Sequence, residues 1–289
     1  MEGLVVDNPK IVVDNLSYRY PTAQRFAIEN ISFSVSKGEF VGVIGRNGSG
    51  KSTLCLSISG LAPKLFRGKR LGSVLIDGVD VLEMSRRDVI KKVGLVLQNP
   101  FSQISGAKMT VFEEVAFGLE NLGIERDEMI EKVEAILKRV GLWEKKFENP
   151  FELSGGQLQR LAIASMLVLE PEVIILDEPT SQLDPQGTVE VFEILTELRK
   201  SGFTIILVEH KLEKLVEYAD RILFLNDGKL IAYDEPEKVF SMEEVETYGV
   251  GMPIYTSFCK KLNIRNQSGY YPVKFDETVQ LIRSLNGIA

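Results

Sequence analysis

Hydrophobic and polar positions follow two different patterns along this chain of 289 residues. Continuous apolar runs rich in β-branched residues fill residues 39–45, 173–177 and 204–208, which predicts strands buried on both faces. Apolar residues three and four apart in residues 111–122 and 127–140 predict amphipathic helices. In the second half of the chain the two patterns alternate, and that order is typical of a parallel sheet with helices on both faces.

The other segments complete a β-rich first half and an α/β second half. Short apolar runs that end at glycine or at polar turns predict further strands, and helical spacing predicts further helices. The predicted strands span residues 11–20, 28–35, 72–78 and 93–98, with a hairpin over 221–234, and the predicted helices span 52–61, 188–200 and 212–218. Residues 241–289 have a mixed helical pattern and no chemical motif.

Composition and charge narrow the class of protein. The chain is 44% hydrophobic and 26% charged, which is ordinary for a globular protein, and its net charge of −7 is opposite to that of a general nucleic-acid binder. No apolar run approaches the roughly 18 residues that cross a bilayer, and the first ten residues lack the pattern of a secretion signal. We therefore expect a cytoplasmic protein with no nucleic acid as partner, and any membrane-spanning part would belong to another chain.

A phosphate-binding loop is predicted where GRNGSGKST follows a buried strand and precedes a helix. Glycines at such positions let backbone N–H groups face phosphate oxygens, and the helix amino terminus adds a favourable dipole. Lys51 is expected to reach the β- and γ-phosphates of ATP, and Ser52 to ligate Mg²⁺. The alternative is a glycine-rich turn that binds nothing. The nucleotide-binding candidates of this loop are Gly45, Asn47, Gly48, Ser49, Gly50, Lys51, Ser52 and Thr53.

Two carboxylates end the buried strand in the segment VIILDEP. Asp177 fits the role of holding Mg²⁺ through water. Glu178, one residue further, is placed to act on the water that attacks the γ-phosphate, as a base or as an orienting group. The alternative is an acidic strand end that only caps the next element.

The segment LSGGQLQRLAIA, residues 153–164, resembles the signature motif of the ATP-binding cassette (ABC) ATPases. From its residues alone, Ser154 before two glycines and an apolar helix predicts an N-cap and a second anion-binding helix terminus. In the ABC family, the phosphate loop of one subunit and the signature of another enclose ATP across a head-to-tail dimer. The resemblance therefore implies a second ATPase subunit, identical or related, and ATP contacts for Ser154, Gly155, Gly156 and Gln157.

Three polar positions match further ABC motifs. Gln98 matches the Q-loop glutamine, which touches Mg²⁺ or the attacking water and leads into a helical insert. Asp184 in SQLD matches the D-loop at the dimer interface, although Gln182 stands where the family more often has a small residue. His210, the only histidine, matches the switch histidine that contacts the γ-phosphate; its alternative is a strand-end histidine with structural partners only. Glu209 replaces a threonine common in relatives, which puts local hydrogen bonding in doubt.

An aromatic side chain from the first strand stacks on adenine in this family. Tyr18 and Tyr20 are the candidates, and Tyr20, just before Pro21, is our choice. The alternative makes Tyr18 a core residue and Tyr20 an aromatic at the rim of the strand.

The resemblance implies an α/β fold, the P-loop NTPase fold of the ABC cassette. This cassette has a RecA-like parallel-sheet core, an antiparallel β subdomain and a helical subdomain. We expect the cassette to span residues 10–240, with the helical subdomain at about residues 99–165. Residues 241–289 would form a C-terminal extension that helps to hold the dimer together or packs on its own cassette.

Residues 98–124 are similar to the ATPases of energy-coupling factor (ECF) importers, including VAFGLENLG. In that group two ATPase subunits at the cytoplasmic face of the membrane drive a membrane scaffold protein and a substrate-binding membrane protein, which import a vitamin or a metal ion. Substitutions at Phe101 or Val115 are then expected to impair transport more than ATP hydrolysis. The alternatives are another type of ABC importer and a soluble ABC ATPase that acts outside transport.

Overall fold

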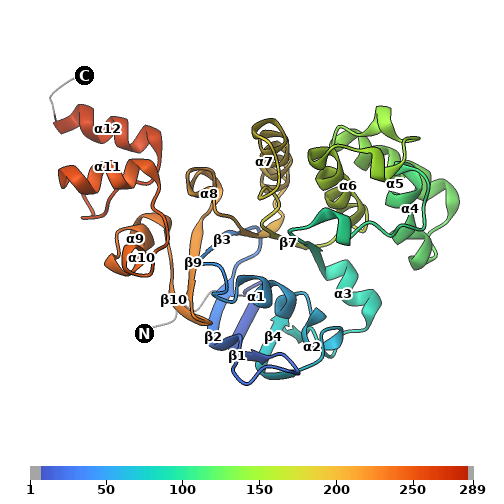
Figure 1. Cartoon of the computed structure of the whole chain (residues 1–289), viewed down its shortest axis with the longest axis horizontal. Coiled ribbons are helices and arrows are strands. Elements are labelled where there is room, and N and C mark those ends of the chain that lie inside the picture. The colour runs from blue at the N-terminus through green and yellow to red at the C-terminus, as the bar shows by residue number, and fades with distance from the viewer. Residues whose placement is uncertain (1–7, 286–289) are drawn as a thin grey trace.

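The structure, a computed structural model, describes residues 8–285. Its centre is a six-stranded sheet in the order β10-β9-β3-β8-β7-β6 (Figure 1). All neighbouring strands from β9 to β6 are parallel, and the edge strand β10 runs antiparallel to β9. The strands are β3 (Phe40–Ile44), β6 (Val93–Val96), β7 (Val173–Asp177), β8 (Thr204–Val208), β9 (Arg221–Asn226) and β10 (Lys229–Asp234).

The central strands agree with the apolar runs that predict them. Every residue of β3, β7 and β8 is buried, because helices or the second sheet cover both faces. Val208 is in register with Val43 on one side and with Asp177 on the other. The loops that follow these three strands therefore leave the sheet side by side at one edge.

A second, antiparallel sheet has the order β2-β1-β4-β5. Tyr18 in β1 is fully buried, and it belongs to the apolar cluster that this sheet shares with the helix after the phosphate loop. The strand predicted from residue 72 begins at Lys69, where β4 pairs with the end of β1. The strands are β1 (Ile11–Arg19), β2 (Ile28–Val35), β4 (Lys69–Ile76) and β5 (Val79–Asp80).

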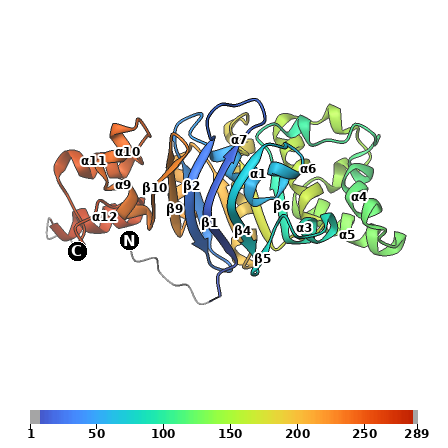
Figure 2. The ribbon, with the colours of Figure 1, turned by 90° about the horizontal axis from the view of Figure 1, so that it is seen from below.

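The helices form groups at the two ends of the molecule as well as beside the central sheet. In Figures 1 and 2, α4, α5 and α6 lie at one end and α9 to α12 at the other. The helices are α1 (Lys51–Ile58), α2 (Leu61–Lys64), α3 (Arg86–Lys92), α4 (Val111–Leu122), α5 (Arg126–Arg139), α6 (Gly155–Leu167), α7 (Pro185–Lys200), α8 (Leu212–Tyr218), α9 (Pro236–Phe240), α10 (Glu243–Thr247), α11 (Ile254–Leu262) and α12 (Phe275–Leu285), with short 3-10 turns η1 (Pro100–Ser102), η2 (Trp143–Lys145) and η3 (Pro150–Glu152).

Two helix boundaries differ from the sequence prediction for local reasons. Helix α7 begins at Pro185, three residues before the predicted start, because the Asp184 side chain accepts a hydrogen bond from the Gly187 N–H and proline suits the first helical position. Helix α1 ends at Ile58 rather than at residue 61, since Gly60 takes a positive φ of 73° between α1 and α2.

The two residues predicted to couple ATP to transport have different surroundings. Val115 is fully buried in the apolar cluster that includes α4, α5 and α6, so it could influence a partner only through the packing of these helices, and its effect on transport stays a prediction. Phe101, in the turn η1 before α4, is 54% exposed. Among residues 8–285, no helix combines the length and the apolar character needed to cross a membrane.

Candidate active site

The phosphate loop connects β3 to α1, and two of its glycines are required by the backbone. A Cβ on Gly45 would lie 2.3 Å from the Leu225 carbonyl oxygen, and one on Gly50 would lie 2.8 Å from the Ala27 carbonyl oxygen. Both residues also have a positive φ, 149° for Gly45 and 102° for Gly50. Gly50 is the N-cap of α1. Only glycine fits these positions without strain, so the loop can bring its backbone N–H groups close to an anion.

Lys51 is buried at the mouth of this loop. Its ammonium group donates to the Gly45 carbonyl at 2.8 Å and to the Arg46 carbonyl at 3.1 Å, and it lies 3.8 Å from Glu178 Oε1. Burial lowers the pKa of Lys51, and the nearby Glu178 and Asp177 oppose that shift. The loop thus presents one cation where phosphate oxygens would enter.

Asp177 ends β7 beneath the start of α1. Burial raises the pKa of its carboxyl group, while a hydrogen bond with Ser52 and the charge of Lys51 lower it. Its Oδ1 atom is buried and has no hydrogen-bond partner among the described residues. An orphaned carboxylate oxygen beside a serine hydroxyl suits a hard cation such as Mg²⁺, which prefers oxygen ligands, so these residues fit the metal predicted here.

Glu178 joins groups that are far apart in the sequence. Its Oε1 is 2.9 Å from His210 Nε2, and its Oε2 accepts from Gln98 Nε2 at 2.8 Å. Glu178 has a positive φ of 50°, an uncommon conformation for a residue with a side chain. The end of β7, the end of β6 and the loop after β8 therefore meet at one carboxylate.

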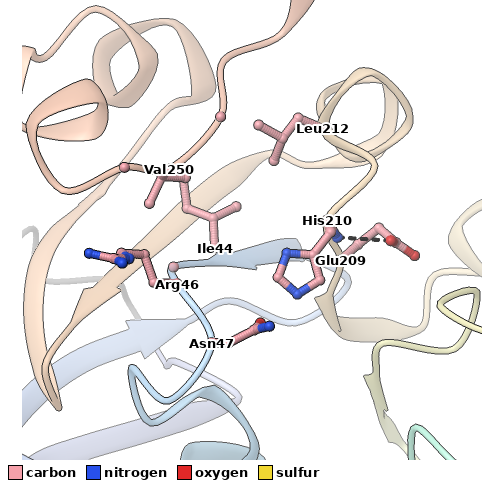
Figure 3. Close-up of a pocket in the computed structure, with 10 residues that line it drawn as sticks. Ile44, Arg46, Asn47, Glu209, His210, Leu212 and Val250 are labelled. Atoms are coloured by element: carbon pink, nitrogen blue, oxygen red, sulfur yellow. Dashed lines mark hydrogen bonds between the residues drawn. The ribbon is translucent and has the colours of Figure 1, made fainter.

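Two cavities lie beside the phosphate loop, and Glu178 lines one of them. One, of about 340 Å³, is lined by the phosphate loop from Asn47 to Thr53, by Gln98 and by Glu178. The other, of about 400 Å³, is lined by Asn47, by His210 and Glu209 on one side, and by Arg46 and Val250 of the C-terminal residues on the other (Figure 3). Asn47 lines both cavities, so the loop separates them.

The two tyrosines of the first strand have different surroundings. Tyr18 is fully buried and donates to the Arg67 carbonyl, which makes it a core residue. Tyr20 is partly exposed, packs edge-on against Tyr18, and its hydroxyl lies 3.2 Å from Thr53 Oγ1 of α1. Tyr20 is therefore the aromatic that borders the phosphate loop and remains the candidate for adenine stacking.

The signature residues line a separate cavity of about 330 Å³. Ser154 caps α6, because its hydroxyl accepts a hydrogen bond from the Gln157 N–H. The Gln157 side chain in turn accepts from the Ser154 N–H, which completes a capping box. A Cβ on Gly156 would lie 3.3 Å from Gly187 Cα, so the starts of α6 and α7 approach closely. Ser154, Gly155, Gly156, Gln157 and Asp184 thus lie together, but not with the phosphate loop of their own chain.

The sequence reasoning missed the part played by two residues beside His210. Glu209 was expected only to disturb local hydrogen bonding, and Lys211 was not singled out at all. In the structure both side chains reach Thr180 in the loop after Glu178. The sequence pattern does not indicate these contacts, because a charged residue that follows an apolar strand usually faces solvent.

Comparison with known proteins agrees with this geometry. The pattern that defines the ABC transporter family matches residues 28–181. A protein of Pyrococcus horikoshii, described provisionally as an ABC transporter ATP-binding protein, is 46% identical over 94% of this chain and 96% of its own. The energy-coupling factor transporter ATP-binding protein EcfA1 of Lacticaseibacillus paracasei is 45% identical over 80% of this chain and 81% of its own.

A solved structure supports the same assignment. CbiO1 of Clostridium perfringens, part of the ABC transporter complex CbiONQ, is 32% identical, with a TM-score of 0.71 over 91% of this chain and 98% of its own. The fold class predicted from the sequence is confirmed. The chain belongs to the ABC transporter family, as an ATP-binding subunit that hydrolyses ATP.

Proposed function

We propose that this chain is an ATPase subunit of an ECF-type importer for a vitamin or a metal ion, bound to the cytoplasmic face of the membrane. The observation that carries the catalytic part is the Glu178 carboxylate, which joins Gln98 and His210 beside the phosphate loop. The similarity to EcfA1 and to CbiO1 supports the choice of ECF transporters.

ATP binding depends on the loop and on Lys51. Backbone N–H groups at the start of α1 would hold the phosphates, and Lys51 would exchange its two carbonyl contacts for the β- and γ-phosphate oxygens. Tyr20 would stack on the adenine, since it borders Thr53 at the open side of the loop.

Hydrolysis depends on Glu178. Its carboxylate would accept the proton of the attacking water or orient that water, and Gln98 and His210 would hold the carboxylate and the γ-phosphate in place. When bound, Mg²⁺ would be held by Ser52, Asp177 and Gln98, and it would supply charge neutralisation of the phosphates.

A dimer would be needed to enclose ATP, because the signature residues 154–157 line a cavity that contains no residue of the phosphate loop. The N-terminus of α6 is a ready anion site, and a second subunit placed head to tail would bring it to the γ-phosphate. Each chain would then offer one phosphate loop and one signature, and Asp184 would lie at the interface.

Transport would be coupled to ATP through the Q-loop. Gln98 contacts Glu178, and the chain continues directly into the exposed Phe101 and then towards α4. A membrane scaffold protein that docks on this surface could therefore respond to the nucleotide state.

Phe101→Ala is expected to lower substrate transport about tenfold in vesicles that contain the complete importer, because an exposed aromatic side chain is a typical anchor of an interface. ATP hydrolysis by the isolated chain should change less than about twofold. Phe66→Ala, 41% exposed in the loop between α2 and β4, is the matched control. Equal losses of transport and hydrolysis in Phe101→Ala would count against this coupling surface.

The C-terminal residues offer a contact for the dimer. Ile254, Phe258 and Leu262 repeat every four residues on α11 and are 60%, 47% and 56% exposed. Phe258→Glu is expected to weaken the dimer at least about tenfold, since it buries a charge in an apolar interface. Analytical ultracentrifugation would measure this, with Ile130→Glu on α5 as the control. A dimer of unchanged strength would mean that residues 241–289 pack only on their own cassette.

The decisive test of the importer is co-purification of the tagged chain from gently solubilised membranes of its native cell. Recovery of a small scaffold membrane protein, a substrate-binding membrane protein and a second ATPase would support the proposal. A chain that stays in the soluble fraction would leave ATP hydrolysis standing and favour an ABC ATPase that acts outside transport.

A further inference from the structure

Glu209 is a buried acidic residue directly before His210. Only 2% of it is exposed. Its Oε1 accepts from the backbone N–H groups of His210 at 2.8 Å and of Lys211 at 3.1 Å, and the first of these bonds is drawn in Figure 3. Its Oε2 accepts from the Thr180 hydroxyl at 2.6 Å. A buried carboxyl group is costly unless it is hydrogen-bonded, so these three donors fix its position.

These bonds connect two loops that leave neighbouring strands. Thr180 is fully buried and follows Glu178 by two residues. Lys211 adds a second connection, because its ammonium group donates to the Thr180 carbonyl at 3.2 Å and to Thr188 Oγ1 in α7 at 2.6 Å. The loop after β8 is thus attached to the loop after β7 through side chains on both sides of His210.

The imidazole of His210 has little else to hold it. Its side chain is 46% exposed, whereas that of Glu178 is only 13% exposed. The position of the imidazole relative to Glu178 therefore depends mainly on the backbone at residues 209–211. Catalytic groups need placement to within roughly half an ångström, so the backbone that carries His210 must be fixed.

We propose that Glu209 is a positioning residue for ATP hydrolysis, which holds His210 against Glu178 by joining the loops after β7 and β8. This inference rests on the roles proposed for Glu178 and His210. A threonine at this position has a side chain two atoms shorter, so it could not hold the His210 backbone and reach Thr180 together. Glutamate therefore provides a loop-to-loop connection that a shorter residue would lack.

Glu209→Ala is expected to lower kcat about 10- to 100-fold, because a small displacement of a catalytic group has effects of that size. The KM for ATP should change less than about threefold, since Glu209 does not line the cavity that holds Lys51, Ser52 and Thr53. Glu209→Gln keeps an oxygen for the two backbone N–H groups and should recover most of the loss. Thr180→Val removes one donor and should give an intermediate kcat, which tests the inference even if Glu209→Ala does not fold.

A double-mutant cycle with His210→Ala separates positioning from general stability. If Glu209 acts through His210, Glu209→Ala should lower kcat no further in the His210→Ala background. If it lowers kcat by the same factor in both backgrounds, the positioning role is overturned while the function of His210 stands. If His210→Ala alone leaves kcat unchanged, the proposed role of His210 fails and the positioning role fails with it.

Discussion

Replacing Glu178 with Gln is expected to slow ATP hydrolysis about 10²- to 10⁴-fold, the range for loss of a general base. The amide is nearly the same size and can still meet Gln98 and His210, which lie 2.8 and 2.9 Å from the carboxylate. ATP affinity should change less than about threefold, because the loop backbone and Lys51 keep their positions. Single-turnover hydrolysis and equilibrium binding of ATP measure the two effects separately.

Glu217→Gln is the matched control for this substitution. It makes the same chemical change on the exposed side of α8, close in sequence to His210, where Glu217 pairs with Lys214 at 3.4 Å. Its hydrolysis rate should equal that of the unaltered chain. Normal turnover in Glu178→Gln would remove Glu178 from the mechanism and leave His210 and Gln98 without the group they hold.

The phosphate loop and the meeting of Asp177, Glu178 and His210 could be predicted from the sequence. The loop is a local motif with a buried strand before it and a helix after it. Glu178 and His210 are 32 residues apart, but both follow apolar strands, and the carboxyl ends of adjacent parallel strands lie at one edge. The pattern placed each residue at a strand end, and the resemblance to the ABC family supplied the expectation that they act together.

Side-chain burial, loop contacts and strand order depend on packing that the sequence pattern does not specify. The helical spacing of α4 identifies an apolar side but does not say which residues of that side are covered, so the sequence alone did not show that Val115 is fully buried while Phe101 is exposed. The hydrogen bond from Thr180 to Glu209 depends on the conformation of two loops, and loop conformation has no periodic signal. The order of strands in the sheet likewise follows from pairing and not from the pattern of any one segment.

Ser154→Arg is expected to abolish ATP-driven dimer formation while each chain still binds ATP. Ser154 and Gly155 are exposed at the start of α6, in a cavity that contains no residue of the phosphate loop. An arginine here removes the N-cap and fills the anion site, so a partner's ATP could no longer dock. The change should appear at the dimer and not at the nucleotide pocket of the same chain.

The experiment is clearest in the Glu178→Gln background, where ATP persists because hydrolysis is slow. Light scattering with and without ATP and Mg²⁺ reports the dimer, and a fluorescent ATP analogue reports binding to each chain. Asn121→Arg, an exposed polar residue of α4, adds the same charge away from the signature and should leave the ATP-driven dimer intact. Loss of ATP binding in Ser154→Arg would mean that the signature acts within its own chain. An unchanged dimer would mean that ATP is not enclosed head to tail, because the enclosed γ-phosphate needs the free N-terminus of the partner's α6.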